Sequence, residues 1–263
     1  MTSLSSSNAS AKPETWVDLV KTGLLALLAA IFIRTVLVQP FRIPSGSMQP
    51  TLLVGDYIMV SKGAYGYSRF SPPLFEFGPH GRLMVPLLSH PPERGDVVVF
   101  RPPHDIKTDY VKRLIGLPGD RVQMRDGALY INGDAVEREL IGAQSFKDWA
   151  ETYPSGKFEG VLGEVQAYRE TLPNGVSYIT FNRYESDLDE TAEFVVPQGH
   201  YFMMGDDRDK SDDSRLHVGM VPFENLVGRA DFVFISFEPS SSLFRPWTLF
   251  TDFRPSRTFK GLK

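Results

Sequence analysis

Residues 94–120 of this 263-residue chain read RGDVVVFRPPHDIKTDYVKRLIGLPGD, and this stretch decides the fold class. The apolar run 97–100 predicts a buried strand, and a proline-containing loop separates it from a second apolar run at 110–117. The rest of the chain has the same character, with 20 Pro, 22 Gly and 19 Phe among many short Val, Ile and Tyr runs. We therefore expect a mainly β protein whose strands are interrupted by turns.

Lys112 lies inside the second of these runs. Strand alternation places Tyr110, Lys112 and Leu114 on one face, and turns Arg113 to the other face, towards solvent or an acid. A lysine among apolar neighbours loses ammonium hydration, so its pKa falls and its neutral amine becomes available as a base. The alternative is a surface lysine on an amphipathic strand, which would be the better interpretation if this were the only clue.

A serine-containing segment, PFRIPSGSMQPTL at 40–52, supplies a candidate nucleophile. Its prolines and glycine favour an extended, exposed backbone on which Ser45 and Ser47 face the same way. One hydroxyl can attack a carbonyl, while the other hydroxyl and the Ser47 backbone N–H donate to the developing oxyanion. An ordinary Ser/Gly/Pro loop remains the alternative. The five histidines occupy Pro/Gly-rich or turn-like surroundings and no Gly-x-Ser-x-Gly elbow is present, which leaves Lys112 as the candidate base.

The third cluster, GDDRDKSDDSR at 205–215, is dense in acids and hydroxyls. A calcium loop is excluded because neither Asp207 nor Asp209 begins an EF-hand spacing with its central Gly and terminal Glu. We expect Ser211 to hold the lysine amine and Asp213 to pair with Arg215 beneath the site. A solvated turn is the alternative for the acids.

Composition limits the function classes. With 42% apolar and 23% charged residues, the chain can bury one large core or two small ones. A formal charge of −4 argues against nucleic-acid binding, because there is no basic excess to neutralise phosphates. The absence of Cys excludes disulfides, cysteine-zinc sites and a thiol nucleophile.

The N-terminal region has a different composition. Residues 1–15 are Ser/Ala-rich and are predicted to form a disordered tail, and residues 16–38 read as one apolar helix. A cleaved signal peptide and a buried core helix compete with a membrane anchor, since the uncharged run 22–33 is shorter than the roughly 20 residues of a span. Lys21 and Arg34 can extend it by snorkelling, and no small-x-small cleavage site follows. We therefore predict a transmembrane anchor over residues 16–39.

These clusters, in this order behind an apolar helix, resemble bacterial type I signal peptidases. The resemblance rests on a Ser-Gly-Ser-Met-x-Pro-Thr-Leu box at 45–52, Gly55-Asp56, an Arg-Gly-Asp strand at 94–100, a lysine box at 110–120, the acidic box at 205–215, Val221-Pro222 and the segment 226–230. It implies that Ser47 is the nucleophile, Lys112 the general base and Ser45 an oxyanion donor. Ser211 would orient the lysine, and Asp213 and Arg215 would support the site.

The resemblance also implies a substrate and its pocket. The enzyme would cut signal peptides from preproteins after small residues, at Ala-x-Ala sites, without metal or cofactor. Apolar substrate-binding walls would fall on Phe41, Ile43, Pro44, Met48, Leu52, Ile58, Tyr110 and Val111. Two positions depart from the family pattern: Asp207 stands where many members have Asn, and Lys210 stands where a small polar residue is usual. We expect the Asp207 carboxylate to raise the pKa of Lys112.

The implied fold is a twisted, mostly antiparallel β catalytic core over 40–121 and 198–263, with a second β region inserted at 122–197. Within the insert, the turns Asp126-Gly127 and Asn132-Gly133 bracket 128–131 and predict a hairpin. The implied location is the bacterial inner membrane, crossed once, with the catalytic domain on the outer, periplasmic side and the tail of residues 1–15 in the cytoplasm. The implied partners are preprotein signal peptides and the lipid bilayer.

Two further segments, 70–77 and 244–250, combine aromatic residues with a loop-like composition, and the second is followed by four basic residues. Buried core and a bilayer interface both explain them. Two rival functions also remain open. One is a self-cleaving repressor-type Ser/Lys protease, which would need a DNA-binding domain. The other is a catalytically silent, membrane-tethered β binding module.

Overall fold

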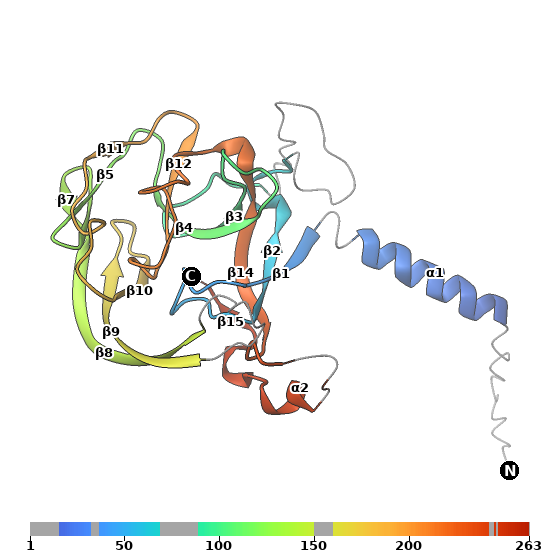
Figure 1. Ribbon diagram of the computed structural model, residues 1–263. Helices are drawn as coiled ribbons and strands as arrows, with labels where there is room; N and C mark the ends of the chain where they lie inside the picture. Colours follow the sequence, from blue (N-terminus) through green and yellow to red (C-terminus); the bar gives the residue numbers. More distant parts are fainter. Residues whose placement is uncertain are drawn as a thin grey trace, which may run out of the picture.

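The structure of the protein is a computed structural model that describes residues 16–32, 37–68, 89–149, 160–241, 245 and 247–262. The predicted tail at 1–15 and the apolar segment 70–77 lie outside the described residues. The described residues form three β-sheets, and helix α1 lies to one side of them (Figure 1).

The largest sheet has eight strands in the order β1-β2-β14-β3-β4-β12-β13, with β15 paired to β14. All its strand pairs are antiparallel, which confirms the predicted mainly β, antiparallel fold. Its strands are β1 (Val38–Arg42), β2 (Asp56–Ser61), β3 (Val97–Phe100), β4 (Tyr110–Gly116), β12 (His200–Met204), β13 (Val221–Pro222), β14 (Leu226–Ser236) and β15 (Lys260–Gly261).

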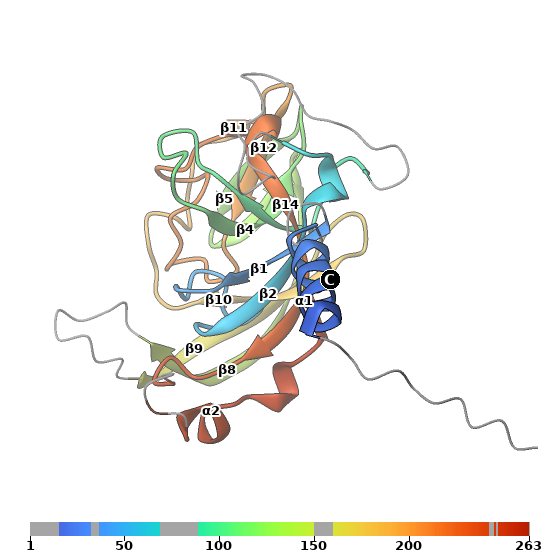
Figure 2. The ribbon, with the colours of Figure 1, turned by 90° about the vertical axis from the view of Figure 1, so that its right-hand side faces the viewer.

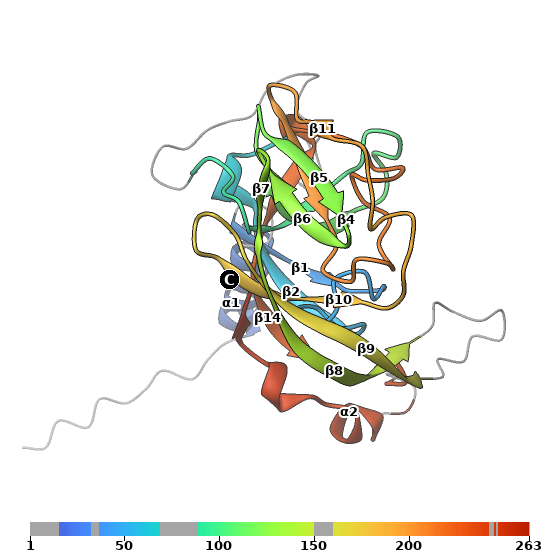
Figure 3. The same cartoon turned by 90° about the vertical axis from the view of Figure 1, so that its left-hand side faces the viewer.

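The strands between β4 and β12 form two smaller sheets. One has the order β11-β5-β6-β7 and the other the order β10-β9-β8, and Figure 3 shows them together. Strands β8 and β9 form a long hairpin that extends towards the side of the molecule where α2 lies (Figure 1). The strands are β5 (Arg121–Arg125), β6 (Ala128–Ile131), β7 (Asp134–Ala135), β8 (Glu137–Trp149), β9 (Gly160–Thr171), β10 (Ser177–Asn182) and β11 (Phe194–Val195).

Both predicted turns around residues 128–131 are confirmed. β6 pairs with β5 on one side and with β7 on the other. At the turns, Asp126 and Gly127 have φ of 48° and 69°, and Asn132 and Gly133 have φ of 57° and 92°. Asn, Asp and Gly adopt this left-handed region at low cost, so the sequence fixes both reversals.

The stretch 94–120 folds as the predicted strand, loop and strand. Every residue of β3 is buried, and β4 lies between β3 and β12 with Val98 opposite Lys112. Valines on β3 face two core clusters: Val97 and Val99 pack in one of them, and Val98 packs in the other. Lys112 is therefore carried on an interior strand of the sheet.

The N-terminal helix is shorter than predicted. α1 covers Trp16–Phe32, 17 residues, and Val38 and Gln39, which were assigned to the anchor, instead open β1. Pairing of Val38 with Ser61 on β2 holds this segment extended, and Pro40 is tolerated because β1 is an edge strand.

Among the described residues, no helix is both long and apolar enough to span a bilayer. Figures 1 and 2 show α1 outside the three sheets.

The remaining helical segments are single turns. A 3-10 turn at Lys62–Tyr65 follows β2, and another at Phe223–Asn225 precedes β14. Near the C-terminus lie α2 (Thr248–Thr251) and a 3-10 turn at Pro255–Arg257. After this turn the chain returns to the main sheet as β15.

Candidate active site

Ser47 and Lys112 meet at the centre of the candidate site. Ser47 lies in the loop between β1 and β2, Lys112 lies on β4, and the Lys112 Nζ donates a hydrogen bond to the Ser47 Oγ. Both side chains are almost excluded from solvent, with Ser47 8% and Lys112 4% exposed. A nucleophile and a base are thus in direct contact, the arrangement that proton transfer from the hydroxyl requires.

The surroundings of Lys112 lower its pKa from 10.5 to about 8. Burial is the main cause, because it penalises the charged ammonium, and Arg215 acts in the same direction. The carboxylates of Asp213, Asp212 and Asp206 partly oppose this effect by raising the pKa. About a tenth of the amine is therefore neutral at pH 7, far more than for an exposed lysine.

Ser45 lies beside the nucleophile, with its Oγ 3.5 Å from the Ser47 Oγ. The loop that carries both serines is fixed through its main chain: the Gln49 N–H donates to the Gly46 carbonyl at 2.9 Å, and the Ile43 N–H donates to the Asp56 carbonyl at 2.8 Å. The expected arrangement, in which the two hydroxyls lie close together on the same side of the loop, is present.

Gly205, in the acidic segment, allows a very close approach of two chain segments. A Cβ at this position would lie 2.2 Å from the Ser211 Oγ and 2.5 Å from the Ser47 carbonyl oxygen. Only glycine therefore lets Ser211 come so near the nucleophile loop. The Ser211 hydroxyl is buried and has no hydrogen-bond partner among the described residues, so its expected bond to the lysine amine is not formed here.

Asp213 and Arg215 form the predicted pair. The Arg215 Nε and Nη2 donate to the two carboxylate oxygens of Asp213 at 3.0 and 2.9 Å, and both side chains are buried. The Gly205 N–H also donates to Asp213 at 3.0 Å. These bonds and Arg215 lower the pKa of Asp213 against the opposing effect of burial, so a fixed negative charge stands near Lys112.

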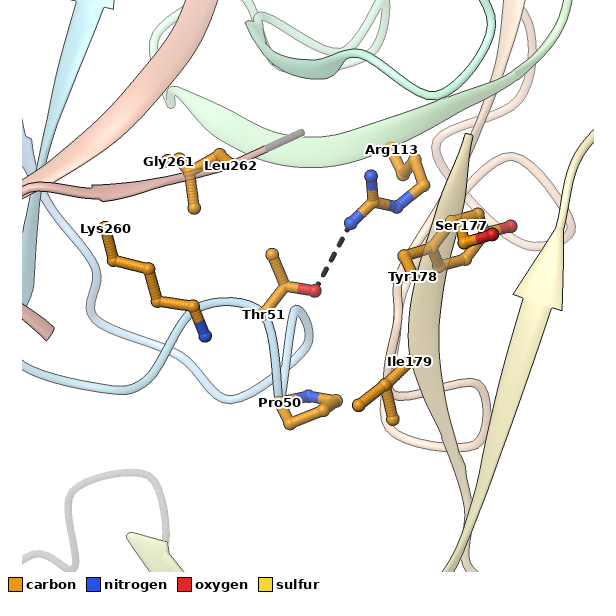
Figure 4. A pocket seen from close by; sticks show the side chains of 9 residues that line it. All are labelled: Pro50, Thr51, Arg113, Ser177, Tyr178, Ile179, Lys260, Gly261 and Leu262. Carbon is orange, nitrogen blue, oxygen red and sulfur yellow. Dashed lines mark hydrogen bonds between the residues drawn. The ribbon is translucent and has the colours of Figure 1, made fainter. Parts of the chain in front are cut away.

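Arg113 points to the opposite face of β4 from Lys112 and meets an acid, as predicted. Its Nε and Nη2 donate to Asp206 at 2.8 and 2.7 Å, and its guanidinium lies 4.0 Å from the ring centre of Tyr178. Its Nη2 also donates to the Thr51 Oγ1 at 3.2 Å, beside a cavity of about 190 Å³ behind the nucleophile loop (Figure 4). Sequence reasoning did not assign Asp206 this partner, although its place in the acidic segment made it available.

Asp207 has an ion-pair partner that the sequence did not predict. Its buried carboxylate pairs with Arg183, whose Nε donates to it at 2.9 Å and whose Nη2 donates at 2.6 Å. The charge of Asp207 is therefore offset, and the carboxylates with the largest effect on the pKa of Lys112 are those of Asp213, Asp212 and Asp206. Arg183 lies in a stretch without recognisable motifs, so no sequence signal pointed to it. Lys210, the other departure, donates its N–H to the Asp207 carbonyl at 3.2 Å.

The eight predicted substrate-binding residues fall into three groups. Ile43, Met48, Leu52 and Ile58 belong to one core cluster, where Ile43 is 2% exposed and the other three are fully buried, so in this structure they expose almost no surface to a peptide. Partly buried side chains lie around this core: Phe41 and Val111 pack against the same cluster, and Tyr110 packs against another. Pro44 is exposed.

The C-terminal aromatic segment is only partly buried. Trp247 is 62% and Phe250 86% exposed, which excludes the buried-core interpretation for these two side chains. Two of the basic residues that follow this segment form hydrogen bonds within the protein. Arg257 donates to the buried carboxylate of Asp56, the first residue of β2, at 2.5 Å, and Arg254 donates to the carbonyl of Val54, in the loop before it, at 2.7 Å. Both therefore hold the C-terminal segment to the start of β2.

Comparison with known proteins identifies relatives over most of the chain. A family described as "Signal peptidase, peptidase S26" matches residues 16–235. Signal peptidase I of Rickettsia massiliae is 42% identical over 241 residues, which cover 88% of this chain and 82% of the relative, and that of Rickettsia akari is 39% identical with the same coverage. A crystal structure of a signal peptidase I from Enterococcus faecalis is 26% identical and covers 53% of this chain and 97% of its own, with a TM-score of 0.30 that is too low to bear on the fold.

Proposed function

Because the chain belongs to the signal peptidase family, peptidase S26, it is a serine endopeptidase, and we propose that it removes N-terminal signal peptides from exported preproteins by Ser/Lys acyl transfer. The observation that carries this proposal is the buried contact between the Lys112 Nζ and the Ser47 Oγ. The lowered pKa of Lys112, about 8, supports its role as the base.

In the first half of the reaction, neutral Lys112 accepts the Ser47 hydroxyl proton while the Ser47 Oγ attacks the scissile carbonyl carbon. The carbonyl π electrons move to its oxygen, and the Ser47 backbone N–H and the Ser45 hydroxyl stabilise this oxyanion. When the tetrahedral state collapses, the C–N bond breaks and the Lys112 ammonium returns the proton to the leaving amine. The mature protein is released and the signal peptide remains as an ester on Ser47.

In the second half, a water molecule attacks the ester carbonyl while Lys112 accepts its proton. The C–O bond to Ser47 then breaks, and the proton passes to the serine oxygen, which restores the free enzyme. Asp213 and Arg215 support this cycle by fixing the main chain at Gly205. The buried Ser211 hydroxyl has no hydrogen-bond partner among the described residues. It can therefore orient the amine once Lys112 moves away from Ser47.

The cleavage site is proposed to have small residues on its signal-peptide side, at Ala-x-Ala motifs. The full burial of Met48 and Leu52 supports this, because side chains packed into the core cannot easily move aside to admit a large residue. The partly buried Phe41, Tyr110 and Val111 would then contact the peptide, and a large residue would clash with them.

We also propose that residues 40–121 and 198–263 act as the catalytic core and 122–197 as an insert. Membrane attachment, with the core on the outer side of the bacterial inner membrane, belongs to the same proposal. The apolar side chains of α1 support it, since Leu25 is 69% and Ile31 46% exposed. Trp247 and Phe250 suit a bilayer interface for the same reason.

The test uses the full-length protein in detergent and a preprotein with an Ala-x-Ala site. Wild-type protein should release a fragment cut after the second alanine. Ser47→Ala and Lys112→Ala should each abolish the cut while circular dichroism and thermal unfolding show a folded protein. Processing by either variant at the wild-type rate would refute the dyad, and no cleavage by the wild type would favour a non-catalytic binding module.

A further inference from the structure

Arg183 comes directly after β10 and reaches from the small sheet to the nucleophile loop. Its guanidinium forms a two-pronged ion pair with Asp207, in which the Arg183 side chain is 13% exposed and that of Asp207 is fully buried. The main chains of the two segments also meet: the Phe181 N–H donates to the Asp206 carbonyl at 2.8 Å. Arg183 is thus held firmly in place between the two sheets.

The ion pair acts on the main chain after the nucleophilic serine. The Asp207 N–H donates to the Ser47 carbonyl at 3.2 Å. This bond fixes the peptide unit that links Ser47 to Met48. Because the side chain of Asp207 is anchored by Arg183, the position of this donor depends on the arginine.

A second contact acts on the main chain before the serine. The Arg183 Nη2 donates to the Gln49 Oε1 at 3.3 Å, and Gln49 is 1% exposed. Its side chain lies under Gly46, where a Cβ would be 3.3 Å from the Gln49 Cδ and Nε2. The Gln49 Nε2 has no hydrogen-bond partner within the described part of the chain, so the bond from Arg183 is an important constraint on this amide.

We propose that Arg183 is a positioning residue for the nucleophile, since it holds Gln49 beneath Gly46 and Asp207 against the Ser47 carbonyl. The peptide unit between Gly46 and Ser47 carries the backbone N–H that serves as an oxyanion donor. Its orientation therefore depends on both contacts of one guanidinium. This inference rests on the proposed Ser47 chemistry and adds a residue from the small sheets to it.

Only a guanidinium suits this position. Its Nε and Nη2 hold the Asp207 carboxylate, and the same Nη2 also reaches the Gln49 Oε1 at 3.3 Å. A lysine side chain ends one bond short of Nη2, so an ammonium that stays on the carboxylate no longer reaches the Gln49 amide. Arg183→Lys should therefore keep the buried charge balanced, and thus the fold, while it releases Gln49. A small displacement of reacting groups is enough to cost about ten- to a hundredfold in rate.

The test compares Arg183→Lys, Gln49→Met and the double variant in preprotein cleavage. Each single variant should lower kcat by about tenfold or more with little change in KM, and the double variant should be no slower than the slower single, because both changes break one contact. Thermal unfolding of Arg183→Lys should stay near that of the wild type. Arg169→Lys is the matched control, since Arg169 forms an exposed pair with Glu139 at 2.7 Å on the small sheet.

Each alternative result has a distinct meaning. If Arg183→Lys cleaves at the wild-type rate, or if the two rate losses multiply fully, the positioning role is refuted. It is also refuted if a smaller amount of folded protein fully explains the loss of kcat, or if KM alone changes. A wild-type protein that does not cleave the preprotein refutes the proposed function itself, before the role of Arg183 is tested.

Discussion

Replacing Lys112 by Met should produce an inactive protein that is more stable than the wild type at neutral pH. Folding lowers the pKa of this lysine from 10.5 to about 8, chiefly through burial. At pH 7 the difference between these two pKa values corresponds to about 3 kcal/mol of folding free energy lost through the lysine. Methionine fills a similar volume without a charge, so the substitution removes this cost.

The net gain is smaller because one interaction is lost. The hydrogen bond from the Lys112 Nζ to the Ser47 Oγ contributes about 1 kcal/mol, which leaves an expected stabilisation of about 2 kcal/mol at pH 7. Between pH 8 and 10.5 the unfolded wild-type chain holds more protons on this lysine than the folded chain does. Wild-type stability therefore rises with pH across this window, and the advantage of the methionine variant should disappear by its upper end.

The assay is urea unfolding of both full-length proteins in detergent at pH 7, 8, 9 and 10.5. Lys107→Met, at an exposed position, is the control and should match the wild type throughout. A Lys112→Met protein that is no more stable than the wild type at pH 7 would show that burial does not penalise the ammonium. A stability difference that stays constant with pH would show that its origin is packing rather than protonation.

Three further outcomes follow from the site. The value of kcat/KM should rise about tenfold from pH 7 to pH 9, as Lys112 with a pKa of about 8 becomes neutral, and a flat profile would remove it as the base. Ser45→Ala should lower kcat by about ten- to a thousandfold with a much smaller change in KM, whereas a change in KM alone would make Ser45 a binding residue. Gly205→Ala should lower kcat by about a hundredfold, because its Cβ would meet Ser211 at 2.2 Å, while Gly23→Ala, with open space around it, should cleave normally in the same assay.

Local patterns in the sequence were enough to predict the elements that carry the site. Strands at 97–100 and 110–116, the orientation of Lys112 away from Arg113, and the two turns around 128–131 all depend on neighbouring residues. Side-chain alternation and the left-handed preference of Asn, Asp and Gly act within a few residues. The pairing of Asp213 with Arg215 was predictable for the same reason, since the two are close in the chain.

The position at which α1 ends and the burial of the predicted pocket residues depended on more distant parts of the chain. Val38 continues an apolar run, but pairing with β2 holds it in a strand instead of a helix. Met48 and Leu52 look like pocket walls next to a catalytic serine, yet packing against β2, β3 and β14 buries them fully. Tertiary contacts outweighed the local pattern in both cases.

The sequence by itself determined which residues can perform the chemistry: a serine in a constrained loop, a lysine on an apolar strand face and an acidic segment with its own arginine. Only the tertiary structure decided their mutual contacts. Ser47 and Lys112 are 65 positions apart, and they meet because the order of strands in the main sheet brings β4 to the nucleophile loop. The pairing of Asp207 with Arg183 likewise depends on where β10 ends beside the acidic segment. Such contacts depend on which strands lie next to each other and on how deeply the side chains are buried. Burial and neighbouring charges determine the pKa of each group, and neither can be predicted from the residues adjacent in the sequence.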